Sequence, residues 1–119
     1  MTAGESGLEL GVIGNCQIAA LIDHAGRLIW SCLPRLDGDP FFCALLTREH
    51  AAPTEGVFAI EVRGLARTEQ AYVRNSAILE TTLHDAQGGA VRIVDFCPRF
   101  RWRGRMFRPT MIVRLVEPL

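Results

Sequence analysis

The chain has 119 residues, 49% apolar and 22% charged, a composition typical of a folded globular domain and not of a disordered segment. Its length allows one hydrophobic core and excludes two independent domains. Thirteen basic residues balance thirteen acidic ones, so net charge gives no reason to expect a nucleic-acid or anionic-membrane partner. The apolar runs are shorter than a membrane span and the N-terminus lacks the basic start of a secretory signal, which predicts a cytoplasmic location without membrane contact.

The first half of the chain predicts one β-hairpin followed by a loop and a short helix. Residues 11–14 are interpreted as a turn, because they lack the third glycine and the preceding strand of a dinucleotide site. Apolar runs at 18–22 and 28–32 flank an Asp- and Gly-containing turn, which predicts a hairpin covered on both faces. Residues 33–40 contain two prolines and a glycine and predict a structured loop. Residues 41–46 favour a helix that begins after Pro40, and 47–56 form a connection.

The second half predicts antiparallel strands. Apolar residues alternate over 57–62 and 79–84, a more polar strand lies at 67–74, and a turn at 85–89 leads to a strand at 91–97. Met111, Val113 and Leu115 mark a last strand. About seven strands, one short helix and no βαβ alternation predict a mainly β, antiparallel sandwich. Because the last strand reaches the final residue, the sequence leaves open whether this sandwich is whole or part of a larger one.

The motifs of common catalytic and metal sites are absent from the sequence. The four cysteines lie far apart without a Cys-x-x-Cys pair, and the three histidines stand alone, so we expect no metal site. Three of the cysteines lie in apolar runs, which favours core thiols over disulfides. There is no Gly-x-Ser-x-Gly elbow and no phosphate-binding glycine loop. Glu80 and Asp95 lie on strands expected to be neighbours, and both a glycosidase-type acid–base pair and two structural carboxylates remain open. We assign no catalytic residue and expect no cofactor.

Residues 98–108 carry the strongest local bias, with five arginines, three aromatic residues and no acid. Without those five arginines, eight basic residues face thirteen acidic ones, so the remainder of the chain has a net charge of minus five. One interpretation is a nucleic-acid site in which the aromatic rings stack on bases. The other is a hairpin whose arginines pair with carboxylates of this domain or an adjoining one, and we expect no nucleic-acid partner. The candidate interface patch consists of Arg99, Arg101, Trp102, Arg103 and Arg105.

Several phrases of the sequence together resemble a known family. These are Leu-Gly-Val-Ile-Gly-Asn at 10–15, Ala-Ala-Leu-Ile-Asp at 19–23, Gly-Arg-Leu-Ile-Trp-Ser-Cys-Leu-Pro-Arg-Leu-Asp at 26–37, Phe-Cys-Ala-Leu-Leu at 42–46, Asn-Ser-Ala-Ile-Leu-Glu-Thr-Thr at 75–82 and Val-Asp-Phe-Cys-Pro-Arg at 94–99. From about Leu8 to Val116 the chain resembles the opening of bacterial glycoside hydrolase family 15 proteins, the glucoamylase and trehalase-like group. It departs from the family phrase at Ile29, where Asp is common, and at 36–38, where the family has Phe-Asp-Ser.

This resemblance implies an N-terminal β-sandwich packed on a C-terminal (α/α)6 barrel. In that barrel two glutamates hydrolyse an α-glucosidic bond with inversion, one as acid and one activating water. No residue of this chain corresponds to the barrel, so neither glutamate is carried over. We therefore expect residues 1–119 to form a single N-terminal sandwich domain, or a fragment of one, that supports the barrel and is not catalytic alone.

The loop at 33–40 is the candidate for reaching the barrel or its sugar cleft. Trp30 offers an aromatic face to a glucosyl ring, while Arg35 and Asp37 offer hydrogen bonds to hydroxyls or to partner groups. The alternative is that Trp30 lies in the core and Arg35 pairs with Asp37.

The expected partners are the barrel and an α-glucan or trehalose substrate, with self-association through an exposed sheet edge. A different class of function is a free-standing module. Such a module would bind carbohydrate through Trp30 and Trp102, or nucleic acid through residues 99–108.

Overall fold

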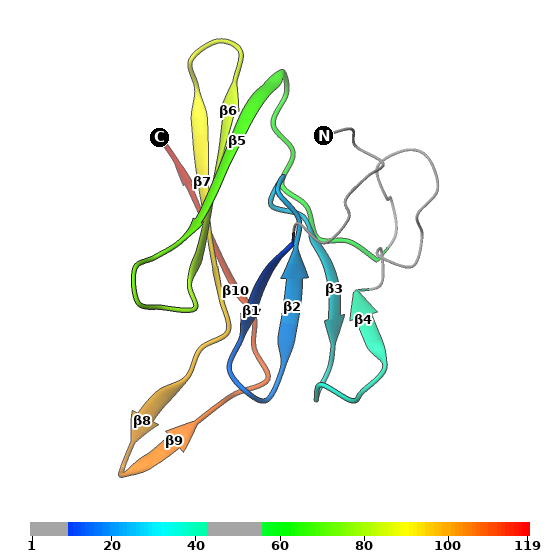
Figure 1. Cartoon of the computed structure of the whole chain (residues 1–119), viewed down its shortest axis with the longest axis vertical. Helices are drawn as coiled ribbons and strands as arrows, with labels where there is room; N and C mark the ends of the chain where they lie inside the picture. Colours follow the sequence, from blue (N-terminus) through cyan, green and yellow to red (C-terminus); the bar gives the residue numbers. More distant parts are fainter. Residues whose placement is uncertain (1–9, 43–55) are drawn as a thin grey trace.

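The structure, a computed structural model, describes residues 10–42 and 56–119 as an antiparallel β fold (Figure 1). Sheet A has the order β1-β2-β3-β4, sheet B has the order β10-β7-β6-β5, and β8 and β9 pair separately. The described residues contain no helix and hence none that could span a membrane. The predicted mainly β, antiparallel class is confirmed. The strands are β1 (Gly11–Gly14), β2 (Ala19–Ile22), β3 (Leu28–Cys32), β4 (Pro40–Phe42), β5 (Leu65–Tyr72), β6 (Leu79–Asp85), β7 (Ala90–Phe96), β8 (Phe100–Trp102), β9 (Arg105–Phe107) and β10 (Val113–Pro118).

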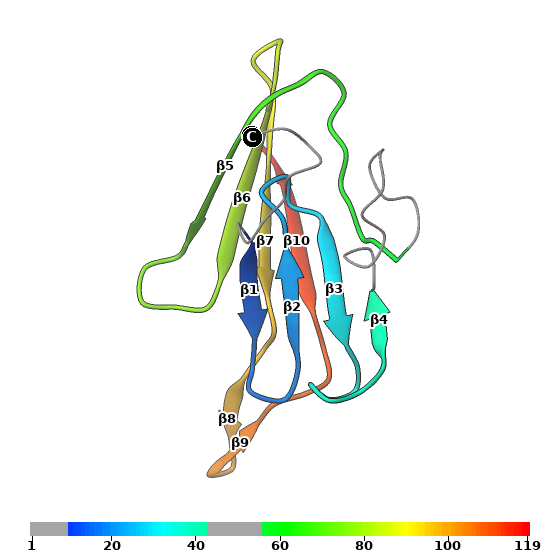
Figure 2. The same cartoon turned by 45° about the vertical axis from the view of Figure 1, so that its right-hand side comes forward.

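Sheets A and B face each other as two layers, and in Figure 2 β1 to β3 lie in front of β7 and β10. Side chains that alternate along each strand meet between the layers, which is the usual origin of a sandwich core. The contacts of β1 with β6 and β7 join the layers directly. The core contains Ile13, Ile18, Ala20, Ile22 and Leu28 from sheet A and its turn, and Leu79, Leu83, Ile93 and Cys97 from sheet B and its end.

The predicted β-hairpin of residues 18–32 is confirmed as β2 and β3. The carboxylate of Asp23 shapes its turn, because Oδ1 accepts from the backbone N–H groups of Ala25 and Arg27 at 3.0 and 2.9 Å. Gly26 has a φ of 78°. A Cβ there would lie 3.2 Å from Thr81 and 3.3 Å from Ile93, so this turn lies against the inner face of sheet B.

Residues 11–14 form strand β1, so their interpretation as a turn is wrong. Ile13 is fully buried while Val12 is exposed, the alternation of a strand with one face in the core. A Cβ at Gly11 would lie 2.6 Å from the Leu79 side chain, so this glycine brings β1 close to sheet B. The hydroxyl of Tyr72 covers the free edge of β1, since it donates to the C=O of Val12 and accepts from its N–H, both at 2.8 Å.

The strand predicted at 57–62 is also wrong, because only Phe58 pairs, in a single bridge with Leu28. The same edge of β3 is already occupied further along by β4, which pairs with Ser31 and Cys32. Residues 57–62 therefore alternate like a strand, but in the described part of the chain only Phe58 forms backbone hydrogen bonds with a neighbouring strand. The helix predicted at 41–46 is wrong at its start, because Phe41 and Phe42 belong to strand β4 and Phe42 pairs with Ser31 of β3. This strand pairing overrides the local helix preference. Residues 43–46 lie outside the described residues.

The cysteines divide between core and surface. Cys97 is buried and Cys32 half-buried, as expected for thiols in apolar runs, whereas Cys16, which has polar neighbours in the sequence, is exposed. Cys16 lies in the turn between β1 and β2 with a φ of 74°, and in this turn Asn15 and Ile18 take the buried positions. Cys43 lies outside the described residues.

Candidate functional site

The loop predicted at 33–40 connects β3 to β4 at one end of the sandwich, the same end as the β8–β9 hairpin and opposite the β6–β7 turn (Figures 1 and 2). Nε of Arg35 lies 3.3 Å from Oδ1 of Asp37, and both side chains are largely exposed. Gly38 closes the loop by donating its N–H to the C=O of Arg35 at 2.9 Å. The two residues therefore pair with each other on the surface, where such a pair contributes little to stability.

Trp30 lies in the middle of β3, opposite Leu21 of β2, and is half-buried. Its neighbours in β3, Ile29 and Ser31, are buried, and the hydroxyl of Ser31 donates to the C=O of Ala19 at 2.9 Å. Adjacent strand residues point to opposite faces. Trp30 therefore lies on the side of sheet A away from its buried neighbours, with part of its ring open to a ligand or an adjoining surface.

Strands β8 and β9 form a hairpin that projects beyond the ends of both sheets (Figures 1 and 2). Its turn is Arg103–Gly104, with φ values of 51° and 74°. Positive φ at both central residues is the signature of a type I′ turn, which matches the twist of paired strands. All residues from Arg99 to Arg108 are exposed. The predicted hairpin in this arginine-rich segment is confirmed.

The strand register divides the side chains of the hairpin between two faces. Directly opposed residues point to the same side of a ribbon. The ring centroids of Phe100 and Phe107 are 5.7 Å apart and those of Trp102 and Phe107 are 5.6 Å apart, so three rings form one cluster. The ring face consists of Phe100, Trp102, Arg105 and Phe107, and the opposite face carries Arg101 and Met106.

The arginines of the hairpin have no carboxylate partner among the described residues. Ion pairs there join five other arginines to acids: Arg27, Arg35, Arg67, Arg92 and Arg114. The guanidinium of Arg103 lies over the ring of Trp102, 4.5 Å from its centroid, and Nη1 of Arg99 lies 4.0 Å from the sulfur of Cys16. The sequence predicts that these arginines pair with carboxylates of this domain or of an adjoining one; no such pair forms among the described residues, and pairing with an adjoining domain stays a prediction.

Asn15 fixes the base of the hairpin to the sandwich. Its side-chain N–H₂ donates to the C=O of Pro98 at 3.0 Å and to the C=O of Pro109 at 2.8 Å, one on each side of the hairpin. Its Oδ1 accepts from the N–H groups of Gln17 and Ile18. Asn15 is 2% exposed and uses both of its donors, so it acts as a clamp between the β1–β2 turn and the hairpin.

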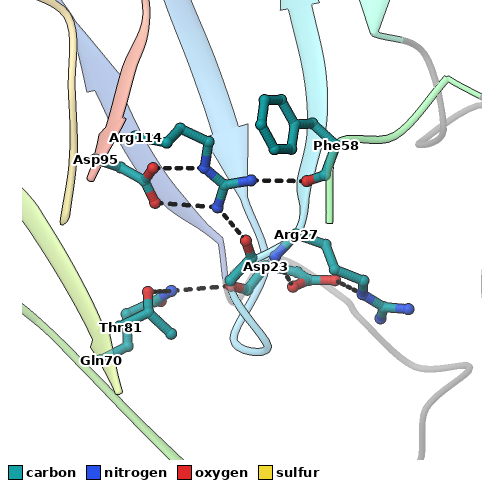
Figure 3. Close-up of polar contacts among 8 residues, drawn as sticks. Asp23, Arg27, Phe58, Gln70, Thr81, Asp95 and Arg114 are labelled. Atoms are coloured by element: carbon teal, nitrogen blue, oxygen red, sulfur yellow. Dashed lines mark hydrogen bonds and ion pairs between the residues drawn. The ribbon is translucent and has the colours of Figure 1, made fainter. Parts of the chain in front are cut away.

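A buried ion pair joins the neighbouring strands β7 and β10 of sheet B, and its arginine also reaches the β2–β3 turn of sheet A (Figure 3). Nε of Arg114 donates to Oδ1 of Asp95 at 2.6 Å and Nη2 donates to Oδ2 at 3.2 Å. This is the bidentate geometry typical of strong guanidinium–carboxylate pairs. The same guanidinium donates to the C=O of Phe58 at 2.7 Å and to the C=O of Gly26. Nε2 of Gln70 adds a second link, because it donates to the C=O of Asp23 at 2.8 Å and to Thr81 at 3.0 Å. These contacts hold the β2–β3 turn on sheet B.

The geometry excludes Glu80 and Asp95 as a facing acid–base pair. β6 and β7 are neighbours as expected, but Asp95 is opposite Leu79 and Glu80 is opposite Val94. The two carboxylates therefore point to opposite faces of sheet B. Asp95 is fully buried on the inner face, where burial raises the pKa of its carboxyl above 3.8 and the hydrogen bond and charge of Arg114 partly offset that rise. Its arrangement is that of a structural residue.

The remaining chemistry of the described residues also points to structure. Burial, and then the charge of Asp95, raise the pKa of the Cys97 thiol to about 11, so this thiol stays protonated and unreactive near neutral pH. In the residues that the structure describes, no three His, Cys, Asp or Glu side chains gather as metal ligands. An apolar pocket opens between β3, β4 and the segment before β10, lined by Leu28, Leu33, Phe42, Phe58, Met111 and Ile112 among others.

Fold and contacts together define an antiparallel β-sandwich domain with an exposed aromatic and arginine-rich hairpin at one end. The family model described as "Trehalase-like, N-terminal" matches residues 5–116, and the chain belongs to this family. The trehalase of Mycolicibacterium smegmatis (strain ATCC 700084 / mc(2)155) is 34% identical over 74 residues, which is 62% of this chain and 10% of that protein. The matched segment is thus a small part of the length of this curated relative. No solved structure matches the chain.

Proposed function

We propose that this chain is the single, non-catalytic N-terminal β-sandwich domain of a longer, cytoplasmic hydrolase of glycoside hydrolase family 15, and that it supports a catalytic (α/α)6 barrel. The observation that carries the proposal is the family match, which extends over residues 5–116. The buried ion pair and the Asn15 clamp support it, because both hold the fold together and neither presents a group to a substrate. In the whole protein, inverting hydrolysis of an α-glucosidic bond in trehalose or an α-glucan falls to the barrel.

The experiment is to produce the natural polypeptide that carries this chain and measure its mass and its hydrolysis of trehalose and maltose. Proton NMR of the first product formed reports the anomer, and inversion releases the β form from an α bond. A polypeptide with hydrolase activity that inverts the anomer supports the proposal. A polypeptide that ends at Leu119, or one without activity on either sugar, contradicts it and favours the free-standing binding module.

The loop at 33–40 has its own test within this proposal. We propose that Arg35 and Asp37 contact either the sugar cleft or the barrel. Arg35→Ala in the natural polypeptide is expected to raise KM if the loop contacts sugar, and to lower the thermal midpoint if it contacts the barrel. Arg74 is a matched control, since it is exposed in the turn between β5 and β6. An Arg35→Ala variant that matches Arg74→Ala in both measurements contradicts both roles.

A further inference from the structure

We propose that the β8–β9 hairpin is a docking arm that inserts its ring face into an acidic, apolar-floored groove of the adjoining catalytic domain, an inference that rests on the proposed function above. The arm is outside the sandwich and contributes nothing to its core, because every residue from 99 to 108 is exposed. Its three aromatic rings therefore remain available to a partner surface.

The composition of the ring face is that of the centre of a protein interface. Phe100, Trp102 and Phe107 are 50%, 54% and 37% exposed although they cluster together. Binding hot spots are enriched in aromatic residues and arginine and depleted in lysine and acids, which matches this segment. Arg105 lies on the same face, so its guanidinium would enter the interface with the rings. We therefore expect the partner surface to be apolar where it contacts the rings and to carry a carboxylate at its edge, next to Arg105.

The charge of the arm identifies the partner as acidic. Five arginines and no acid occur in residues 98–108, and none of the five has a carboxylate partner among the described residues. Guanidinium groups form bidentate hydrogen bonds with carboxylates. An arm of this kind binds most tightly where a partner supplies carboxylates around an apolar centre.

Two other occupants are weighed against the adjoining domain. A nucleic acid is disfavoured, because the chain outside the arm carries a net charge of minus five and repels a long polyanion. A second copy of this chain does offer carboxylates, since Asp39, Glu61 and Glu80 form none of the ion pairs among the described residues, so the oligomeric state is one outcome of the test below. The adjoining domain is favoured because the matched segment is only 10% of the length of the curated relative, which leaves a long stretch of polypeptide to supply the partner surface.

Contacts within the chain fix the conformation of the arm before it binds. Asn15 grips the carbonyls on both sides of the hairpin, and the stacked rings tie its two strands together. A surface that is ordered before binding does not lose conformational freedom when it docks, which favours affinity. The clamp thus connects the β1–β2 turn of the sandwich to the orientation of the arm.

Trypsin provides a direct test, because it cuts after arginine and the arm offers several cleavage sites. In the natural polypeptide we expect cleavage after Arg103 to be at least about tenfold slower than after Arg74, the exposed turn site, when peptides are followed by mass spectrometry over time. Arg105→Glu should raise cleavage at Arg103 at least about tenfold, the equivalent of 1.4 kcal/mol of docking free energy. Arg105→Lys, which keeps the charge, should raise it less, and cleavage at Arg74 should stay unchanged in both variants.

Several outcomes would overturn the docking arm. One is cleavage at Arg103 in the unmodified polypeptide that is as fast as at Arg74, and another is an Arg105→Glu variant as protected as the wild type. A hairpin-dependent dimer in sedimentation would assign the arm to a second copy. Binding of a short fluorescent DNA that weakens steeply with salt would assign it to nucleic acid. Trehalose hydrolysis in the same sample separates the two proposals, since an active polypeptide with an unprotected arm overturns the docking arm alone.

Discussion

Arg114 is the residue whose loss should damage this fold most. It makes four hydrogen bonds from one guanidinium, two to Asp95, one to the C=O of Phe58 and one to the C=O of Gly26. The side chains of Arg114 and Asp95 are 3% and 0% exposed. Arg114→Met fills similar space but leaves a buried carboxylate without its counter-charge. The expected loss is about 3–5 kcal/mol, against a total of about 5–15 kcal/mol for a typical domain.

The double variant Arg114→Met with Asp95→Leu separates the charge from the shape. Replacing both members of a buried ion pair by apolar residues is often neutral or stabilising, so the double variant should recover most of the lost free energy of unfolding. Urea unfolding followed by tryptophan fluorescence gives the three free energies. The reasoning is refuted if Arg114→Met costs less than about 1 kcal/mol, or if the double variant is as unstable as the single one.

The pH dependence of the same variants gives a second check. Burial raises the pKa of Asp95 in the fold above 3.8, so the folded state retains a proton that the unfolded state releases. Stability then falls as pH rises from 3.8 through the raised value, and is level above it. Arg114→Met removes the two effects that lower this pKa and should deepen the fall. The difference between wild type and Arg114→Met should therefore shrink toward the acid end of this range, and an equal difference at acid and neutral pH contradicts the account.

Two further variants and one labelling experiment test other contacts. Asn15→Asp keeps the side-chain shape but removes both donors of the clamp, so it should lower the free energy of unfolding by about 1–3 kcal/mol in urea titrations, and an unchanged midpoint would show that the clamp is idle. Thiol labelling at mildly alkaline pH, read by peptide mass spectrometry, should modify Cys16 rapidly and Cys97 only on unfolding, because the pKa of Cys97 is raised to about 11; fast labelling of Cys97 in the folded chain contradicts this. Tyr72→Phe removes the hydroxyl that bonds both backbone groups of Val12 and should cost about 1–2 kcal/mol in the same titration; a stability equal to wild type would mean that water replaces it fully.

Local chemistry explains which parts of the fold the sequence predicts. The β2–β3 hairpin follows from Asp23 and Gly26, whose turn preferences act over a few residues. Strands β6 and β7 follow from alternation over a long stretch. The failures at 11–14 and 57–62 concern segments whose state depends on what lies beside them, sheet B for the first and the partly occupied edge of β3 for the second.

The polar contacts that organise the molecule could not be predicted, because they join residues far apart in the chain. Arg114 and Asp95 are 19 residues apart, and Arg114 and Gly26 are 88 apart. Asn15 reaches residues 83 and 94 positions away. The signal for the ion pair appears only once β7 and β10 are aligned, since Arg114 then lies directly opposite Asp95.

The arginine-rich hairpin could be predicted from the sequence in part. Its composition indicates an interface, and the Arg103–Gly104 pair between aromatic residues is a turn signal that sequence reasoning passed over. The division into a ring face and an opposite face follows from that turn by simple alternation. The clamp by Asn15 does not follow from the sequence, and it is the clamp that fixes where the face points.

The central claim is that this domain supports the catalytic barrel of the same polypeptide. The most direct measurement is the half-life of trehalose hydrolysis at elevated temperature, compared between the natural polypeptide and a form that lacks residues 1–119. We expect the shortened form to lose activity much faster, or to fold too poorly to be active. A shortened form with the same initial rate and the same half-life as the whole polypeptide would contradict it.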